Sequence, residues 1–352
     1  MGFQGRFGPG LPAVSDGSML FLLHLISKMR DVDPEHEETR GRAAIVLNGS
    51  PLFTGKAGSG ESEIRRWVIE SDLLDAIVAL PTDMFYNTGI ATYIWVLDRK
   101  KPEERRGKVQ LINGSKMFVK MRKSLGSKRK ELSPDDVDAL VKLYGSFEDG
   151  GDKRSKVLTN EAFGYHTITV ERSLRMSFQV TADRVDAAIE SKPVAKLAED
   201  TRTQLRQALL TMDRARVWLD RAEFNTALGK ALGGADVRVG LPLRKALWAA
   251  LSARDESAEP CTGAKGVIEP DPKLRDTENV PLGEDIEEYF AREVAPYVPD
   301  AWIDHSKTKI GYEVPFTRHF YEYIPPRPLE EIDSDVKRLI AEIQLLFSEL
   351  HA

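Results

Sequence analysis

The spacing of apolar residues predicts an α/β domain in the first third of the chain. Four short, continuous apolar runs occur there, at residues 42–48, 73–81, 91–99 and 107–113. Runs of this length are typical of strands that are covered on both faces of a sheet. Between the first two runs, residues 61–71 have apolar side chains at helical spacing, with Ile64, Trp67 and Val68 on one side. This strand–helix–strand order favours a sheet that is at least partly parallel.

Two flanking segments complete the expected domain. Residues 18–30 are apolar all round their middle, which predicts a helix buried against the sheet, capped by Ser15 or Asp16. The charged turn at residues 100–108 is short enough to join the third and fourth runs in an antiparallel hairpin. Ser133 is a suitable N-cap for a further helix, because proline and two aspartates follow it.

The rest of the chain is expected to be mainly helical. Residues 194–253 have a helical pattern that is broken at 232–242, and residues 256–281 are rich in proline and glycine and look irregular. In the last helix the apolar residues are spaced alternately by four and three, as in a coiled-coil seam. This C-terminal seam consists of Ile332, Val336, Leu339, Ile343, Leu346 and Leu350. It either packs internally or docks on a helix of another chain.

Length and cysteine content narrow the class of protein. A chain of 352 residues predicts two or three domains. The single cysteine excludes an internal disulfide framework and a cysteine-rich zinc site, and the histidines lack metal-ligand spacing, so no metal is expected. The most apolar early segment is too short to span a bilayer and lacks the features of a signal peptide, which predicts a cytoplasmic protein.

The distribution of charge along the chain indicates a candidate binding surface. The formal net charge of −5 argues against a general nucleic-acid binder. However, the stretch from Arg99 to Lys130 contains 13 Lys or Arg and only 2 Asp or Glu. A basic block in an acidic protein is a candidate surface for binding a polyanion such as DNA. A solvated loop face explains the same charges, and both interpretations stay open.

A glycine-rich stretch at residues 47–67 raises the question of a nucleotide site. A phosphate-binding Walker loop requires four residues between its two glycines, then Lys and a hydroxyl residue. Here five residues separate Gly49 from Gly55, and Lys56 is followed by Ala57. The stretch therefore reads as a turn leading to a helix that starts near Ser59 or Ser62, rather than as an ATP site.

The most distinctive chemistry follows the second apolar run. A strand ending at Leu80 leads into a polar loop with two adjacent aromatic residues, Phe85 and Tyr86, before the next strand begins. In open α/β sheets, ligands bind at loops beyond the carboxyl ends of strands. The aromatic pair is therefore either a platform for a flat ring or a plug at the top of the core.

The order of these segments resembles a known family. Residues 18–26, 41–48 and 80–101 together look like the modification subunit of type I restriction–modification systems, which are N6-adenine DNA methyltransferases. Residues 158–175, 270–282 and 299–321 look like the C-terminal portion of one branch of these subunits. The most specific parts of the resemblance are residues 80–101 and 299–321.

The resemblance implies a fold and a division of the chain. The fold is α/β, the second half of a Rossmann-like class I methyltransferase sheet followed by a mainly helical C-terminal region. Residues 1–130 would form the C-terminal half of the catalytic domain and residues 131–260 a mainly helical region. Residues 261–352 would contain an irregular segment and the coiled-coil-like helix for subunit docking.

The resemblance also implies a reaction, the transfer of a methyl group from S-adenosylmethionine to N6 of an adenine flipped out of DNA. Family members combine a glycine-rich cofactor motif, an Asn/Asp-Pro-Pro-aromatic motif and a later aromatic that stacks on the base. Only the third part is present, with Phe85 matching the stacking aromatic and Tyr86 the adjacent alternative. No catalytic or cofactor-binding residue is therefore assigned, and the chain alone is expected to be inactive.

Further site residues and partners follow from the same resemblance. The target loop is expected to include Asn48, Ser50, Asn87 and Thr88, although loop hydrogen bonding is an alternative role for the first two. The expected DNA phosphate contacts are Arg99, Lys100, Lys101, Lys116, Lys120, Arg122 and Lys123. The partners would be the specificity subunit, docked on the C-terminal seam, the restriction subunit and DNA. The alternative function is a non-catalytic assembly module that binds the specificity subunit and DNA.

Overall fold

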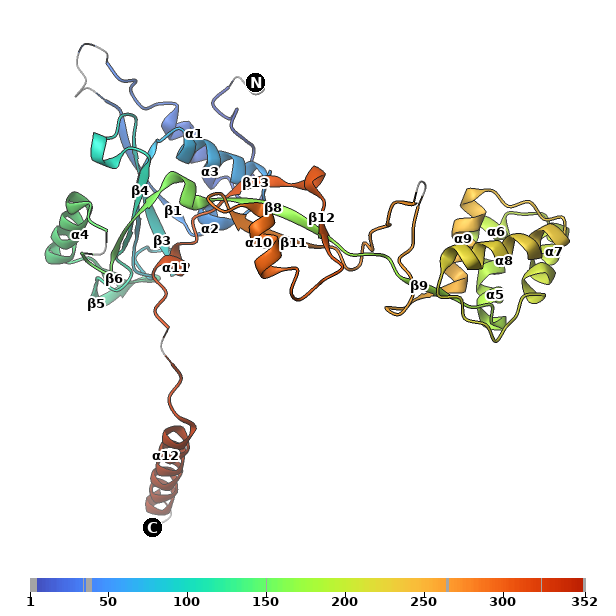
Figure 1. Ribbon diagram of the computed structural model, residues 1–352. Helices are drawn as coiled ribbons and strands as arrows, with labels where there is room; N and C mark the ends of the chain where they lie inside the picture. The colour runs from blue at the N-terminus through green and yellow to red at the C-terminus, as the bar shows by residue number, and fades with distance from the viewer. Residues whose placement is uncertain are drawn as a thin grey trace. The chain divides into compact units, whose positions relative to one another are not determined.

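The computed structural model describes residues 5–33, 35, 40–149, 151–263, 266–323 and 325–350 (Figure 1). The chain forms two compact units, each assembled from separate stretches of sequence. The first unit comprises Met1–Ser15, Gly55–Trp67 and Asn160–Tyr312, and the second comprises Asp16–Thr54, Val68–Thr159 and Glu313–Ala352. The division at residues 130 and 260 that the resemblance implies stays a prediction.

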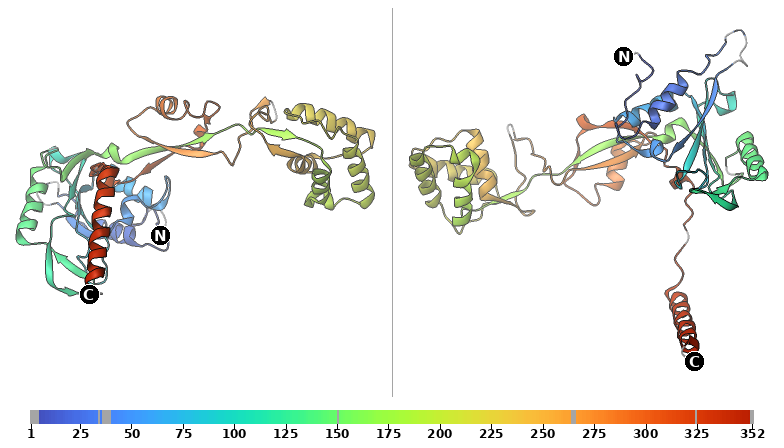
Figure 2. Two further views of the ribbon diagram at one scale, coloured as in Figure 1. Left: turned by 90° about the horizontal axis from the view of Figure 1, so that it is seen from below. Right: turned by 180° about the vertical axis from the view of Figure 1, so that it is seen from behind.

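The second unit is built on a five-stranded sheet in the order β1-β3-β2-β4-β7. Its strands are β1 (Arg42–Asn48), β2 (Leu74–Ala79), β3 (Thr92–Asp98), β4 (Lys108–Asn113) and β7 (Ser155–Thr159). Strands β2 and β4 are parallel, and the other neighbours are antiparallel. The strands stay side by side in every view (Figures 1 and 2). The prediction of an α/β fold with a partly parallel sheet is confirmed.

Two details of the predicted sheet are wrong. Strand β2 is buried at every position, but β1 is an edge strand with alternate residues exposed, so it is not covered on both faces. The charged turn does not close a hairpin, because β2 lies between β3 and β4. The turn crosses the end of β2, where Arg105 Nε donates to the buried Asp75 Oδ1 at 2.7 Å. This buried ion pair gives Arg105, one of the charged residues of the turn, a structural role.

The second unit also contains helices and a hairpin. They are α1 (Ser18–Ile26), α2 (Ser50–Phe53), η1 (Glu103–Arg105), β5 (Val119–Leu125), β6 (Lys128–Glu131), α4 (Pro134–Ser146), α11 (Phe316–His319) and α12 (Leu329–Leu350). Helix α1 buries Leu22 and Leu23 but leaves Phe21 69% exposed, so its burial is one-sided. The prediction of Ser15 or Asp16 as the N-cap is wrong, because the N-cap is Gly17, which has no side chain to accept a bond; Asp16, one residue earlier, accepts from the Ser18 amide through Oδ1. Ser133 caps α4 in a reciprocal capping box, as predicted.

The first unit contains a second sheet and a helical module. Its sheet is formed by β8 (Gly164–Glu171), β11 (Asp276–Pro281), β12 (Trp302–Ile303) and β13 (Lys309–Tyr312), preceded by η2 (Asn160–Phe163) and accompanied by α10 (Ile286–Glu293) and η4 (His305–Lys307). Helix α3 (Gly60–Glu70) belongs to both units. The irregular segment expected up to residue 281 thus ends in a strand.

The helical module is inserted between the paired strands β8 and β11. It consists of α5 (Ala182–Glu190), α6 (Lys192–Ala195), α7 (Glu199–Leu210), α8 (Arg221–Gly234) and α9 (Leu241–Leu251), with the strand pair β9 (Met176–Phe178) and β10 (Ser252–Arg254) at its base. The Phe178 and Phe224 rings stack 4.6 Å apart in its core. The predicted helical region and its break before Leu241 are confirmed.

Candidate nucleic-acid interface

Three strands of the second unit end at the same edge of the five-stranded sheet. Strands β1, β2 and β4 run in one direction, since β1 and β2 are both antiparallel to β3 and β4 is parallel to β2. In register, Asn48 pairs with Thr92, while Ala79 pairs with Asn113 on the neighbouring strand. This carboxyl edge is where open α/β sheets bind their ligands.

The target loop, residues 81–90, leaves this edge after β2. Asp83 adopts a positive φ of 60°, and its amide donates to Gly89 O at 3.3 Å, closing the loop. Phe85 and Thr88 form a bridge across it. The Tyr86 side chain is 69% exposed, whereas Phe85 is half-buried. Tyr86 therefore does not plug the core, and it presents a ring to solvent at the tip of the loop.

The basic hairpin, strands β5 and β6 with their turn, is bonded to the target loop. The Ser127 amide donates to Tyr86 O at 2.8 Å, and the Arg129 amide donates to Asp83 O at 2.9 Å. Gly126, with a φ of +60°, sits so close that an added Cβ would lie 2.6 Å from Tyr86 O. The loop that carries the aromatic pair and the hairpin that carries the cations therefore form one connected surface.

A lysine ties the side chains of this surface together. Lys130 Nζ donates to Thr82 Oγ1 at 3.0 Å and lies 3.6 Å from Asp83 Oδ2. The same ammonium lies 4.3 Å from the centroid of the Phe118 ring, within cation–π range. Lys130 thus stabilises the contact between hairpin and loop, whereas Lys120, Arg122 and Lys123 of the hairpin are exposed to solvent.

The structure divides the basic block into two groups. Lys120, Arg122 and Lys123 are exposed on β5, on the surface shared with the target loop. Arg99 and Lys100 follow the end of β3, which runs antiparallel to its neighbours, so they lie at the opposite edge of the sheet. The expectation of a single basic surface from residue 99 to residue 130 is therefore wrong.

The residues at the opposite edge are occupied with structural contacts. Arg99 Nη2 donates to Ile26 O at 2.9 Å. Lys101 is buried, with Nζ 2.6 Å from Asp72 Oδ1 and 2.7 Å from Lys108 O. Burial lowers the pKa of the Lys101 ammonium, and the Asp72 carboxylate opposes that effect. Such a lysine stabilises the turn and does not present its charge to a solvent-side phosphate.

Two residues that were expected to belong to the target loop, Asn48 and Ser50, lie at the end of β1 and the start of α2 and make hydrogen bonds with their neighbours there. Asn48 Oδ1 accepts from the Ser50 amide at 3.1 Å, and Ser50 Oγ donates to Asp16 Oδ2 at 2.8 Å. Hydrogen bonds from Ser18 and Ser50 lower the pKa of the Asp16 carboxyl. These contacts match the alternative of loop hydrogen bonding.

The other two target-loop residues lie in the loop itself. Asn87 is exposed next to Tyr86, and Thr88 Oγ1 accepts from the Ile90 amide at 3.3 Å. Their role beside a base stays a prediction. The glycine-rich stretch behaves as expected, since α3 begins at Gly60 and Ser59 Oγ accepts from the Ser62 amide.

A basic pocket lies at the same carboxyl edge, and most of it was not predicted from the sequence. This cavity of about 410 Å³ is lined by Asn113, Lys116, Lys153, Arg154, Lys156, His319, Phe320, Tyr321 and Glu322. Only Lys116 was among the expected phosphate contacts. The charged run at residues 152–156 was the available signal, but in sequence it looks like a flexible connector.

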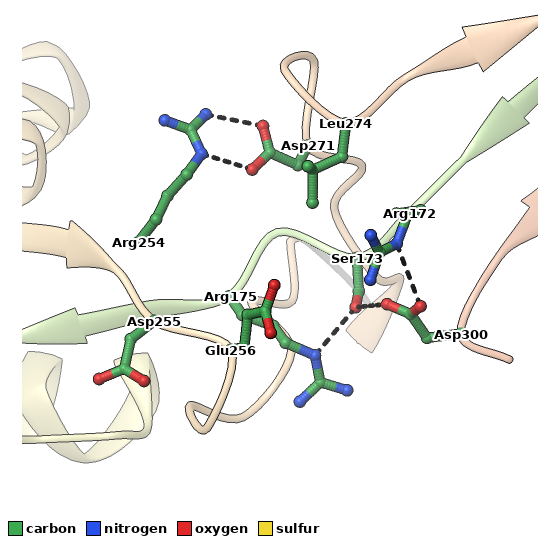
Figure 3. A pocket seen from close by; sticks show the side chains of 9 residues that line it. All are labelled: Arg172, Ser173, Arg175, Arg254, Asp255, Glu256, Asp271, Leu274 and Asp300. Atoms are coloured by element: carbon green, nitrogen blue, oxygen red, sulfur yellow. Dashed lines mark hydrogen bonds and ion pairs between the residues drawn. The ribbon is translucent and has the colours of Figure 1, made fainter. Parts of the chain in front are cut away.

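A cavity of about 540 Å³ lies in the first unit, and unlike the basic pocket it is lined by arginine and aspartate side chains that pair with one another (Figure 3). Arg254 makes a two-pronged ion pair with the buried Asp271, at 2.6 and 2.7 Å. Arg172 Nε and Ser173 Oγ both donate to Asp300, each at 3.2 Å. These guanidinium groups are already neutralised within the chain, which indicates a structural role at the base of the helical module.

The C-terminal seam is exposed. The side chains of Val336, Leu339 and Ile343 are 47%, 50% and 51% exposed, and Ile332 and Leu346 are 37% and 59% exposed. The side chain of Leu350 lies outside the described residues. Internal packing of the seam is therefore absent for the members that the structure describes.

Within the described ranges, no group of three or more His, Cys, Asp or Glu is placed to hold a metal ion. The helices of the described part include none with the length and apolarity needed to cross a membrane.

The chain is similar to methylase subunits of type I restriction enzymes. Residues 3–168 match the family model described as N-6 DNA Methylase. The MjaVIII methylase subunit of Methanocaldococcus jannaschii is 36% identical over 111 residues, which cover 32% of this chain and 18% of that protein. The HindI methylase subunit of Haemophilus influenzae is 27% identical over 231 residues, covering 65% of this chain and 46% of that protein. The resemblance inferred from sequence is confirmed.

A solved structure is similar over a shorter part. The type I restriction-modification methyltransferase subunit of Streptococcus thermophilus is 28% identical, with a TM-score of 0.38, and covers 46% of this chain and 31% of that one. The chain spans less than half the length of the curated relatives described above.

Proposed function

We propose that this chain acts as the modification subunit of a type I restriction–modification system, because residues 3–168 match the family model described as N-6 DNA Methylase. The reaction is S-adenosylmethionine-dependent methylation of adenine N6 in DNA. The part of that reaction assigned to this chain is to hold the target base and its flanking backbone. The alternative is a non-catalytic assembly module that binds DNA and the specificity subunit.

The observation that carries the proposal is that backbone hydrogen bonds join the target loop to the basic hairpin. A flipped adenine needs a flat partner to replace the stacking it loses, and Tyr86 offers an exposed ring beside the half-buried Phe85. Stacking on an aromatic side chain contributes roughly 1–3 kcal/mol per base. The cations of β5 lie on the same surface and suit the phosphates on either side of that base.

The contacts assigned to DNA follow the geometry. Phe85 and Tyr86 are the base-stacking pair, and Asn87 and Thr88 flank the base. Lys120, Arg122 and Lys123 contact phosphates on the hairpin side, and Lys116 contacts them beyond the end of β4. Phosphate contacts are independent of sequence, so target choice is left to the specificity subunit.

Cofactor and methyl transfer are assigned to no residue of this chain. The sequence contains no Asn-Pro-Pro-aromatic segment and no glycine-rich cofactor motif. S-adenosylmethionine, when bound by the complete enzyme, supplies the methyl group. We expect the chain alone neither to bind it nor to transfer a methyl group.

The exposed seam of α12 suits the subunit contact. Its apolar residues follow a coiled-coil spacing, and helices with such seams pair by burying them against a partner helix. The partner proposed here is a helix of the specificity subunit, within an assembly that also includes the restriction subunit.

The test is DNA binding by aromatic variants of the full chain. The ligand is a duplex in which one adenine faces an abasic site, so that flipping costs little. Tyr86→Ala should weaken binding by about 5- to 150-fold, as expected for a lost stacking contact. Phe85→Ala should also weaken it, while Tyr297→Ala, which removes an exposed ring of the other unit, should have no effect. Equal affinities for all three variants would contradict the proposal.

A further inference from the structure

The basic pocket is assembled from three stretches of the second unit. Asn113 ends β4 and Lys116 lies in the turn after it. Lys153 and Arg154 precede β7, and Lys156 lies within it. His319 ends α11, and residues 320–322 follow that helix. Its volume of about 410 Å³ falls in the range of roughly 300–1,000 Å³ that is common for small-ligand sites. The pocket is therefore large enough to hold a phosphate together with its sugar.

Hydrogen bonds hold two of the three stretches that line this pocket, the end of β4 and the start of β7. The Asn113 amide donates to Arg154 O at 2.8 Å, which joins the end of β4 to the start of β7. Asn113 Oδ1 accepts from the Ser115 amide and hydroxyl at 3.2 and 2.6 Å, which shapes the turn that carries Lys116. The backbone that carries the cations is thus held in place, so ligand binding has to order only their side chains.

The charges in the pocket are unbalanced. Lys153 is paired with Glu322 at 3.1 Å, and Arg154 is paired with Asp152 at 2.7 Å. Lys116 and Lys156, in contrast, make no ion pair or side-chain hydrogen bond with the residues that the structure describes. The surplus is positive, as an anion site requires.

Neighbouring titratable groups respond to this positive surplus. The pKa of the Glu322 carboxyl is held low, first by its hydrogen bond from Lys153 and also by the charge of Lys116. The pKa of His319 is lowered, first by burial and then by the charges of Arg318 and Lys156. The charges of Lys116 and Lys156 are minor causes of these shifts, which is consistent with their position beside Glu322 and His319.

The pocket adjoins the target loop. The Gly114 amide donates to Ala79 O at 3.0 Å, and an added Cβ on Gly114 would lie 2.8 Å from the same oxygen. The turn that carries Lys116 thus touches the last residue of β2, from which the target loop departs. A nucleic-acid strand that places a base on the target loop has its neighbouring phosphates at this edge.

We infer that the basic pocket binds a phosphodiester of DNA close to the flipped base, with Lys116 and Lys156 neutralising the phosphate. The inference rests on the proposed function, because it assumes that DNA is bound at the target loop. It adds a second anchor beside that loop, at the end of β4. Tyr321, 73% exposed at the rim, lies beside the sugar or base that follows.

The test is the salt dependence of duplex binding by the full chain. Each phosphate neutralised on B-DNA contributes about 0.9 to the slope of log affinity against log salt. The double variant Lys116→Gln/Lys156→Gln should lower that slope by about 1 and weaken binding about tenfold at low salt. The matched control is Lys142→Gln, an exposed lysine of α4 outside the pocket, which should match the parent chain.

A hairpin variant separates this inference from the proposed function. If Lys120→Gln/Lys123→Gln weakens binding while the pocket variant behaves like the control, the pocket inference is overturned and the proposed function stands. If neither variant changes duplex binding, both are overturned. If both variants lower the slope, the two anchors are both supported.

A third arm distinguishes DNA from a free nucleotide as the source of the phosphate. Adenosine monophosphate is titrated into the parent chain and into the pocket variant. Loss of mononucleotide binding in the variant with unchanged duplex binding would overturn the inference, because the pocket would then serve a free nucleotide. Loss of duplex binding, with or without weak mononucleotide binding, supports it.

Discussion

The amide of Ser127 donates a 2.8 Å hydrogen bond to the carbonyl oxygen of Tyr86. Ser127 lies in the turn of the basic hairpin, and Tyr86 is the exposed aromatic residue of the target loop. Because this bond joins backbone atoms, it fixes the position of the loop relative to the hairpin without using either side chain. The Tyr86 ring and the hairpin cations are thereby free to contact the same ligand.

The first prediction concerns Gly126, next to that bond. Gly126→Ala places a Cβ 2.6 Å from Tyr86 O at a φ of +60°, so the turn must shift. We expect the free energy of unfolding to fall by about 1–2 kcal/mol, and duplex binding to weaken because the loop and hairpin separate. Urea unfolding would measure the first effect and a duplex-binding titration the second, while hydrogen exchange at the Ser127 amide would report the separation of loop and hairpin. Gly145→Ala is the control, since α4 leaves open space there and alanine favours the helix.

The second prediction concerns the buried ion pair between Arg105 of the charged turn and Asp75 of β2. Asp75→Asn leaves the Arg105 guanidinium buried without its carboxylate, and Tyr144 loses the oxygen to which its hydroxyl donates. We expect a loss of about 3–5 kcal/mol in the free energy of unfolding. Asp333→Asn, which removes an exposed pair with Lys337, should cost less than about 1 kcal/mol. Similar losses in the two variants would show that the Asp75 pair is not a main support of the sheet.

The third prediction concerns acid stability of the first unit. The two hydrogen bonds from Arg254 lower the pKa of the buried Asp271 carboxyl. A depressed folded-state pKa stabilises the fold above the unfolded-state value near 4, and this contribution is lost as the pH falls through the folded-state value. Melting temperatures from pH 6 to pH 3 should therefore fall less steeply for Asp271→Asn than for the parent chain. Parallel curves would contradict the assignment.

The fourth prediction concerns the C-terminal seam. Leu339→Lys/Ile343→Lys should leave the melting temperature unchanged, because both side chains are half exposed, and should abolish capture of the specificity subunit. Ile340→Lys is the control, an equally exposed residue of α12 outside the seam spacing. A marked drop in melting temperature for the double variant would instead support internal packing of the seam.

Local patterns in the sequence are enough to predict most of the elements. The strand at residues 42–48, the α4 cap at Ser133 and the start of α3 near Ser59 follow from apolar spacing and capping chemistry between neighbouring residues. The family resemblance also rests on local segments of the chain, so it too can be recognised from the order of residues alone.

The arrangement of those elements is harder to predict. The hairpin expected between β3 and β4 is absent because β2 pairs with both, and strand order depends on contacts between distant residues. The same order carries Arg99 and Lys101 to the edge opposite the target loop. The basic pocket brings Lys153 next to Glu322, 169 positions away, which no local pattern reports. Lys101, buried against Asp72, shows that a lysine within a basic run need not face solvent.

Hydrogen exchange of the full chain with and without duplex DNA tests the central claim most directly, because it reports protection along the whole backbone. We expect DNA to slow exchange in the target loop, residues 81–90, and in the hairpin, residues 119–131, and to leave exchange in the charged turn at residues 99–108 unchanged. Protection at residues 99–108 with no change in the loop and hairpin would contradict that claim.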